Sequence, residues 1–362
     1  MEGLEFLLEI GTEEIPARFL EPALKQLKED AVREFKENRL EYDDIRTYGT
    51  PRRLVLFANG MVKLQASLKT EVKGPAKKAA FDEDGVPTKA AQGFARSQGV
   101  GVQNLTIKSI KGVDYVFATR RESGRMTIDV LSEICVNLIE KMNFPKPMRW
   151  GDLDVKFARP IRWLYSSFGN DTVKFNYAGL TSGKRTWGHR FLGGGSYEVG
   201  NPAGYFVCMD LNYVLVDPVK RRELIIGQIQ ELAEKANGQL KDDPGLLDEV
   251  TNLVEYPTAF IGSFDEKYLE LPPEVLITSM REHQRYFPVF DKNGRLISRF
   301  IAVSNSIPKH INKIRVGNER VLQARLADAQ FFYHEDLKES PEAKAKELSK
   351  VIFLEGLGTV YE

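Results

Sequence analysis

Hydrophobic positions near the start of the chain change from a strand spacing to a helix spacing and back again. Residues 4–10 alternate well enough to predict a β-strand, and residues 53–62 form a second stretch rich in leucine and valine. Between them, Pro16 is followed by apolar residues at helical intervals as far as Asn38, which predicts a helix. The apolar positions of that helix are Phe19, Ala23, Leu24, Leu27, Ala31 and Phe35.

The next stretch of the chain leads to a proline-rich break. Residues 66–88 show no clear period and are expected to form a connection or an extended arm. Residues 104–121 predict a hairpin that turns at Lys111-Gly112. An amphipathic helix follows over residues 128–142. Because prolines come directly after it, we expect a domain boundary at residues 144–152.

The second half of the chain also mixes strand and helix patterns. Its expected elements are strands at 172–177 and 213–216, a helix from Pro218, a hairpin over 286–303 with Asn293-Gly294 at its turn, a helix over 316–333 and a last helix from Ser340-Pro341. The order of elements predicts an α+β fold. We expect two mixed helix/sheet lobes at 1–147 and 148–335, with the arm near 66–88 in the first, followed by a helical extension at 336–362.

Residues 246–286 have the densest polar pattern of the chain. An acidic helix leads to a short apolar strand, and a proline pair then opens a second helix. That helix ends on six polar or aromatic residues, which are Arg281, Glu282, His283, Gln284, Arg285 and Tyr286. Such a cluster indicates a surface that meets a charged partner, although cations at a helix C-terminus also complement the helix dipole.

The composition is that of an ordinary globular protein. Hydrophobic residues make up 42% and charged residues 28% of the chain. Glutamates interrupt every apolar run near the start, and no run of about 18 apolar residues occurs, so we expect neither a signal peptide nor a membrane span. Cys135 falls on the apolar face of a predicted helix, so we expect it and Cys208 to be reduced thiols of an intracellular protein.

The formal net charge is zero, but the charges are unevenly distributed. Residues 149–190 carry eight Lys/Arg against three acids, and residues 281–325 carry ten against three. Between them, residues 231–274 carry eleven acids against three lysines. The basic blocks are candidates for phosphate contact and the acidic block for a basic partner, or the charges only solvate separate faces.

Arginines alternate with tryptophans in the first basic block, as in Arg149-Trp150 and Arg162-Trp163. Arginine can bind phosphate through two hydrogen bonds, and tryptophan can stack on an unpaired base. The alternative is that the tryptophans lie in the core and the arginines pair with acids or carbonyls. The candidate nucleic-acid-binding residues of both blocks are Arg149, Arg159, Arg162, Lys184, Arg185, His189, Arg190, Arg281, His283 and Arg285.

Signatures of a catalytic site are missing from the sequence. There is no HIGH, KMSKS or class II GxGxxxR-type motif, and Gly183-Lys184 lacks both the upstream glycine and the following hydroxyl residue of a P-loop. The four histidines and two cysteines lack the spacing of a zinc site, so no metal is expected. No serine lies in a GxSxG elbow. We therefore expect no catalytic residue in this chain.

Blocks along nearly the whole chain resemble one family. They are residues 7–20 (LLEIGTEEIPARFL), 48–54 (YGTPRRL), 74–81 (GPAKKAAF), 89–100 (KAAQGFARSQGV), 148–152 (MRWGD), 157–163 (FARPIRW), 189–192 (HRFL), 246–286, 317–326 (GNERVLQARL) and 356–361 (GLGTVY). Together they resemble the β subunit of bacterial tetrameric (α2β2) glycyl-tRNA synthetase. That subunit runs on past residue 362, so we interpret the chain as its N-terminal part.

The resemblance implies a role in joining glycine to tRNA-Gly with ATP in the cytoplasm. It implies that the α subunit carries glycine activation, with ATP and Mg, and that the β subunit binds tRNA and assembles with the α subunit without a cofactor of its own. It further implies lobes similar to the B3/B4 domain of the phenylalanyl-tRNA synthetase β chain, with residues 336–362 beginning an HD-type helical domain. His334-Glu335 is not the His-Asp pair of such a domain's metal site.

Three functions remain open from the sequence. The first is a tRNA-binding and assembly part of the synthetase, which we favour. The second is a hydrolytic editing module for mischarged tRNA, although glycine is the smallest amino acid and a tight pocket excludes larger ones. The third is a non-catalytic scaffold for protein partners that uses the acidic block.

Overall fold

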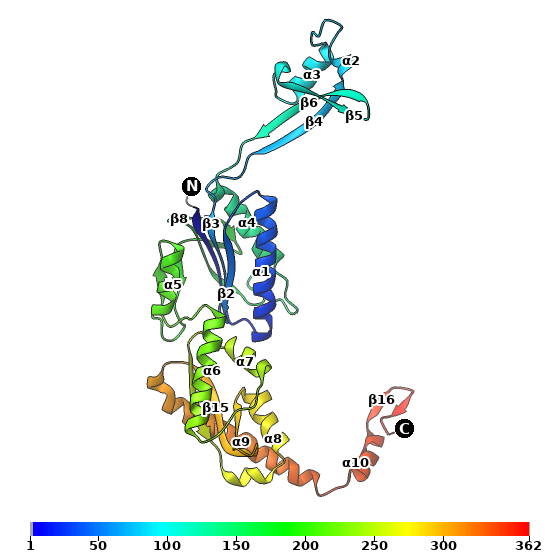
Figure 1. The fold of residues 1–362 in the computed structure, drawn as a ribbon. Helices are drawn as coiled ribbons and strands as arrows, with labels where there is room; N and C mark the ends of the chain where they lie inside the picture. The colour runs from blue at the N-terminus through cyan, green and yellow to red at the C-terminus, as the bar shows by residue number, and fades with distance from the viewer. Residues whose placement is uncertain (1–2, 362) are drawn as a thin grey trace.

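The structure of the protein, a computed structural model, describes residues 3–361, apart from the side chain of Arg121. Figure 1 shows an elongated molecule: a small module projects from one end of a central layer, a second mixed lobe lies at the other end, and the C-terminal residues extend from that lobe. Helices accompany several small antiparallel sheets, which confirms the α+β expectation.

The central layer is a five-stranded antiparallel sheet with the order β2-β3-β1-β7-β8. Its strands are β1 (Leu4–Thr12), β2 (Asp44–Thr50), β3 (Arg53–Met61), β7 (Ile161–Phe168) and β8 (Asp171–Thr172). The helices α1 (Ala17–Glu37) and α4 (Thr127–Lys141) cover one face, and α5 (Pro202–Leu211) lies on the other (Figure 1).

Alternation along β1 assigns its side chains to these two faces. Phe6, Leu8 and Ile10 enter the core with α1 and α4, whereas Leu7 enters the smaller core beneath α5. Glu9 shares the face of Leu7 and is fully buried. A carboxylate is thus placed inside the central layer by the strand period alone.

A module between β3 and α4 projects from this layer. It consists of β4 (Leu68–Ala76), α2 (Lys77–Ala80), α3 (Lys89–Ser97), the short helix η1 (Val102–Asn104), β5 (Leu105–Ile110) and β6 (Val113–Glu122). The sheet order is β4-β6-β5, and the predicted turn at Lys111-Gly112 joins β5 to β6. Residues 66–88, expected to be a connection or an extended arm, supply β4 and α2 of this folded module.

The second lobe is built on a three-stranded sheet with the order β13-β15-β14. Its elements are α6 (Pro218–Lys235), α7 (Pro244–Thr251), β13 (Pro257–Ser263), η2 (Glu266–Glu270), α8 (Pro273–Thr278), the π-helix η3 (Ser279–Gln284), β14 (Phe287–Phe290), β15 (Leu296–Asn305), η4 (Pro308–His310) and α9 (Ile311–Asp336). The predicted hairpin is confirmed, with Gly294 at a φ of 77° in its turn.

Three helices begin at an Asn-Pro or Asp-Pro pair. Asn201, Asp217 and Asp243 cap α5, α6 and α7 through their side-chain oxygens, and a proline follows each as the first helical residue. The helix from Pro218 is confirmed as α6, whereas α5 was not predicted although the same kind of cap begins it.

Short extended segments were predicted less well. The strand expected at 213–216 is wrong, because these residues make no ladder and only single bonds such as Gly49 N to Val216 O, 3.1 Å. The strand expected at 172–177 is divided between β8 and β9 (Asn176–Tyr177). The remaining short strands are β10 (Leu180–Thr181), β11 (Arg185–Trp187) and β12 (Ser196–Glu198).

Two further details differ from the expected organisation. The expected boundary at 144–152 does not break the sheet, since β7 follows it in the chain and pairs with β1. The C-terminal residues are only partly helical: α10 (Pro341–Glu347) and η5 (Leu348–Lys350) precede a hairpin of β16 (Ile352–Leu354) and β17 (Gly358–Thr359).

Candidate nucleic-acid interface

His189 lies inside the protein and shapes the loop that follows β11. Its backbone N–H donates to Asn212 O at 3.0 Å, and its side chain is only 1% exposed. The ring Nδ1 accepts from the backbone N–H groups of Phe191 at 3.2 Å and Leu192 at 3.3 Å. Since Nδ1 is an acceptor, the proton of the neutral ring lies on Nε2. His189 therefore supports the loop and does not itself face the solvent.

The loop that His189 supports presents Phe191 to solvent. The Phe191 side chain is 83% exposed, more than any other large apolar residue described in the structure. Its neighbour in the chain, Arg190, pairs with Glu13 and, at 2.8 Å, with Glu14. The sequence analysis missed Phe191. The signal was an aromatic residue directly after a candidate arginine within HRFL.

The other candidates of the first basic block lie mainly at the surface. Arg162 Nε lies 3.4 Å from Glu13 Oε1, so Glu13 joins Arg162 to Arg190. Arg185 is exposed on β11, opposite Glu198 of β12. The remaining contacts are Arg149 with Asp154 at 3.2 Å, Arg159 with Ala158 O at 2.7 Å and Lys184 with Asn170 O at 2.8 Å. Several of these cations are therefore paired with acids in the free protein.

The tryptophans do not form an open platform. Trp163 is 4% exposed, and its ring centroid lies 4.9 Å from that of Trp187 in a tilted pair. Arg52 and Arg53 lie over the Trp163 ring at 5.5 and 5.6 Å. Trp163 thus packs in the interior, in agreement with the alternative that the sequence left open.

The second constellation is at the end of the π-helix η3. Arg281 pairs with Asp243, the cap of α7, at 3.1 Å through Nη2, and also with Glu282. Arg285 Nε lies 2.8 Å from Glu249 Oε1 on α7, and its φ of 59° ends the helix. The acidic and basic blocks of the sequence therefore meet here. The hydrogen bond from Arg281 holds the pKa of Asp243 below its usual value.

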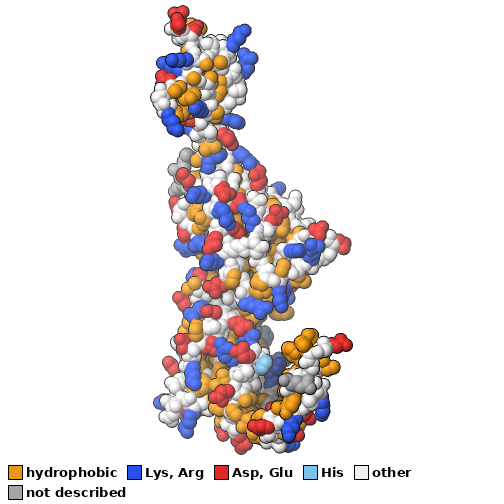
Figure 2. All heavy atoms as spheres, turned by 90° about the vertical axis from the view of Figure 1, so that its right-hand side faces the viewer, with side chains coloured by type: hydrophobic (Ala, Val, Ile, Leu, Met, Phe, Trp, Pro, Cys, Tyr) orange, Lys and Arg blue, Asp and Glu red, His pale blue; other side chains and the backbone are white. Residues whose placement is uncertain are grey.

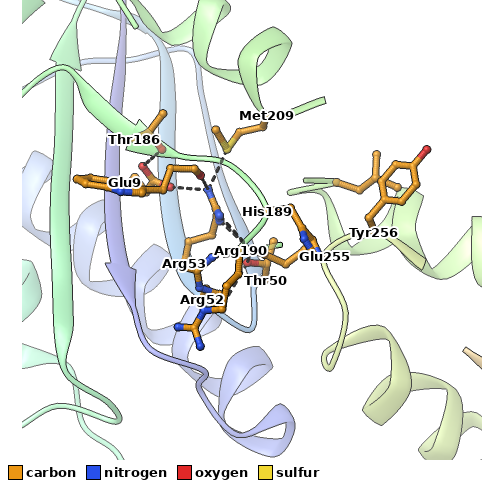
Figure 3. A network of polar contacts seen from close by, with 12 residues as sticks. Glu9, Thr50, Arg52, Arg53, Thr186, His189, Arg190, Met209, Glu255 and Tyr256 are labelled. Carbon is orange, nitrogen blue, oxygen red and sulfur yellow. Dashed lines mark hydrogen bonds and ion pairs between the residues drawn. The ribbon is translucent and has the colours of Figure 1, made fainter. Parts of the chain in front are cut away.

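A buried charge network joins the central layer to the second lobe (Figure 3). Arg53, on β3, donates from Nη1 to Glu9 Oε1 at 3.0 Å and from Nε to Glu255 Oε1 at 3.1 Å. The Thr50 hydroxyl donates to Glu255 Oε1 at 2.7 Å. On the other side, the Thr186 hydroxyl donates to Glu9 at 2.6 Å. All three charged side chains are at most 1% exposed.

Two further side chains complete this junction. The Tyr205 hydroxyl of α5 donates to Glu9 at 2.9 Å, and burial raises the pKa of Tyr205 well above its usual value. Arg221 of α6 donates to Gly49 O at 2.8 Å and to Thr251 O at 2.9 Å. Arg221 thereby ties the second lobe to the edge of the central sheet. Glu9 carried a signal that the sequence analysis did not use, which is an acid between two apolar residues of a strand, Leu8 and Ile10.

The surface does not show one continuous basic band on the face drawn in Figure 2. Lysine and arginine side chains are interspersed with aspartate and glutamate over the central layer and the second lobe. Among residues 3–361, no group of three or more His, Cys, Asp or Glu side chains is placed to hold a metal ion. No helix in that range is both long enough and apolar enough to span a membrane.

Comparison with known proteins now identifies the family. The model of the family described as "Glycyl-tRNA synthetase beta subunit" matches residues 6–362. The chain belongs to this family. The match confirms the resemblance drawn from the sequence blocks and includes both arginine constellations and the buried junction.

Curated relatives carry the corresponding name, "Glycine--tRNA ligase beta subunit". The protein from Desulforamulus reducens is 56% identical over 98% of this chain and 51% of its own length. The proteins from Desulforudis audaxviator and Moorella thermoacetica are 52% and 51% identical over 99% and 98% of this chain. The chain thus spans about half the length of these relatives.

Proposed function

We propose that this chain is part of the β subunit of an α2β2 glycine–tRNA ligase and contributes tRNA binding and subunit assembly. The enzyme joins glycine to tRNA-Gly and converts ATP to AMP and diphosphate. The α subunit carries glycine activation, with ATP and Mg, and this chain holds no cofactor of its own. The observation that carries the proposal is the family match over residues 6–362. The site of action is the cytoplasm.

The geometry supports RNA contact by the exposed cations of both constellations. An exposed ion pair contributes only about 0–1 kcal/mol, so a phosphate can replace the carboxylate partner of Arg190 or Arg281 at little cost. Arginine also binds phosphate with two parallel hydrogen bonds. The exposed Phe191 ring beside Arg190 offers a stacking surface for an unpaired base. His189 positions Phe191 by accepting a hydrogen bond from its backbone N–H.

The fold of the lobes enters the same proposal. We infer that the central layer and the second lobe are similar to the B3/B4 domain of the phenylalanyl-tRNA synthetase β chain, and that residues 336–362 begin an HD-type domain. The antiparallel sheets covered by helices support the first inference. The long helix α9, which leads out of the second lobe, supports the second (Figure 1).

The experiment is a binding titration of the chain with a tRNA-Gly transcript over a range of salt concentrations. RNA binding through phosphates predicts an affinity that falls steeply with salt. Phe191→Ser should weaken binding without lowering the melting temperature, because this side chain is exposed. Val219→Ser, at another exposed apolar residue, is the matched control.

Other results would favour the other functions. Release of a wrong amino acid from mischarged tRNA by the chain alone would identify an editing module. Salt-independent or undetectable tRNA binding, together with capture of the α subunit, would indicate a scaffold. Glycine-dependent exchange of diphosphate into ATP by the purified chain would contradict the assignment of glycine activation to the α subunit.

A further inference from the structure

The projecting module has a sheet with two very different faces. Even-numbered residues of its central strand β6, Val116 and Ala118, are fully buried. Val116 packs in a small core with Ala80 of α2 and Ala91 of α3. The odd-numbered residues of β6 must point to the opposite face, because side chains alternate along a strand. Tyr115 and Phe117 are therefore on the side of the sheet away from α2 and α3.

The register identifies their neighbours on that open face. On β4, Lys73 is paired with Phe117 and Glu71 with Thr119. On β5, Lys108 is paired with Tyr115, and Thr106 with Phe117. The open face thus carries two aromatic rings in the middle and a lysine on either side. It is a three-stranded surface of mixed aromatic, basic and hydroxyl side chains.

The lysines lie directly over the rings. Lys73 Nζ is 3.3 Å from the centroid of Tyr115, and Lys108 Nζ is 5.8 Å from the centroid of Phe117. Lys108 also bonds Glu71 of β4 at 2.7 Å. Because β6 lies between β5 and β4, this ion pair crosses the central strand above Phe117. It explains why Phe117 is only 8% exposed on a face that no core covers.

The cover over Phe117 is weak. The side chains of Lys108 and Glu71 are 48% and 44% exposed, and ion pairs with such exposure contribute little to stability. A phosphate that takes Lys108 from Glu71 would at the same time uncover the Phe117 ring. Binding of a phosphate by Lys108 would therefore also make the Phe117 ring available for stacking.

We propose that this face, defined by Lys73, Lys108, Tyr115 and Phe117, binds unpaired nucleotides of RNA. Bases stack on Tyr115 and Phe117, and the lysines of β4 and β5 hold the phosphates. Proteins that bind single strands combine the same two elements, a basic groove and aromatic rings that accept any base. The site is distinct from both arginine constellations, which lie outside the module.

Charge favours RNA over a peptide partner. Residues 68–122 contain ten Lys/Arg and six Asp/Glu, so the module is basic while the whole chain is neutral. The module also projects from the central layer on two chain segments, so its open face is free to reach a long ligand (Figure 1). In the view of Figure 2, lysines and arginines surround apolar side chains at this end of the molecule.

The test uses the full chain and a short fluorescein-labelled oligoadenylate, followed by fluorescence anisotropy. Tyr115→Leu should weaken binding about tenfold, within the range known for loss of one base–aromatic stack. Lys73→Gln should lower the log–log salt slope by about 0.7, the value for one lost phosphate contact on a single strand. Lys89→Gln on α3 removes the same charge away from the open face and should change neither quantity.

A second readout locates the contact. An oligonucleotide with 5-iodouridine should, on irradiation, crosslink to Tyr115 or Phe117, as identified by mass spectrometry of the digested chain. Melting temperatures establish that each variant is folded. Crosslinks confined to other parts of the chain, or equal affinities for wild type, Tyr115→Leu and Phe117→Leu, would overturn the proposal. Such a result would leave tRNA binding by the arginine constellations untouched, since those residues are tested by their own variants.

Discussion

Arg53 and Arg281 each meet two carboxylates, but in opposite surroundings. Arg53 lies between Glu9 and Glu255 with no exposure of any of the three side chains above 1%. Arg281 lies between Asp243 and Glu282, and its side chain is 38% exposed. Each arginine has two carboxylate partners, yet only Arg281 is exposed enough to exchange a carboxylate for an RNA phosphate. Both arginines are paired with carboxylates, so their difference in burial decides which one stabilises the fold and which one is available to bind RNA.

The difference has an energetic reason. Removal of one partner from a buried pair leaves an uncompensated charge in the interior, whereas an exposed charge returns to water. The buried junction also connects three parts of the chain, which are β1, β3 and the segment between α7 and β13 that carries Glu255. A change there should affect the whole central layer and its attachment to the second lobe.

The largest expected effect is that of Arg53→Met. The variant leaves Glu9 and Glu255 buried without their cation, so we expect a loss of about 3–5 kcal/mol in the free energy of unfolding. Urea denaturation followed by circular dichroism measures it. Arg281→Met is the matched control and should lose less than about 1 kcal/mol. Equal losses for the two variants would remove the distinction drawn between them.

Much of the fold follows from the sequence for reasons that are visible in particular elements. The apolar period predicted α1 to within a residue at each end, and the Asn-Gly turn predicted the β14–β15 hairpin. The prediction of a strand at 213–216 was wrong. The backbone there is extended, but it makes only single hydrogen bonds to Gly49 and Glu255 and joins no sheet. Local pattern cannot distinguish these two uses of an extended chain.

The candidate site was harder to predict than the fold. Arg190 and Arg281 were proposed for nucleic-acid contact from charge clustering, which is a local property, and the structure shows each partly exposed and paired with acids. His189 was expected to contact nucleic acid, but it is only 1% exposed, and its backbone N–H bonds Asn212, which follows α5. The pairing of Arg53 with Glu255 joins residues 202 positions apart, and no local pattern specifies it.

The pH dependence of stability should come from the buried junction. Burial alone would raise the pKa of Glu255, but Arg53, Thr50 and Arg52 hold it below its usual value. A lowered pKa means that the stabilisation is complete above the pKa of the unfolded chain, about 4.3, and is lost as the pH falls through the folded value.

Glu255→Gln should therefore be much less stable than wild type at neutral pH, and the gap should shrink in acid. Urea midpoints measured from neutral pH to below about pH 4.3 test this expectation. Asp243→Asn, at a carboxylate that is 25% exposed, is the less buried counterpart and should show a smaller change of the same sign. A gap for Glu255→Gln that stays constant over the whole range would mean that this carboxylate does not titrate with folding.

The two cysteines give a smaller contrast between buried and accessible groups. Burial raises the pKa of Cys135 to about 12, whereas Cys208 is only partly buried. In native protein, Cys208 should react with a thiol reagent well before Cys135. Under denaturing, non-reducing conditions the count should be two. A count of zero with a monomeric mass would show that the pair is oxidised.

The central claim is that buried arginines stabilise the fold and exposed arginines contact RNA. Its most direct test is the salt dependence of tRNA-Gly affinity for the double variant Arg281→Gln/Arg285→Gln. Arg222→Gln is the control, because Arg222 pairs with Asp248 of the same acidic helix and is 41% exposed. We expect the double variant to bind more weakly, with a log–log slope reduced by about 0.7–0.9 for each lost phosphate contact, and a urea midpoint that falls far less than that of Arg53→Met. An unchanged affinity and slope with a lowered urea midpoint would contradict the account, because these arginines would then hold the fold as Arg53 does.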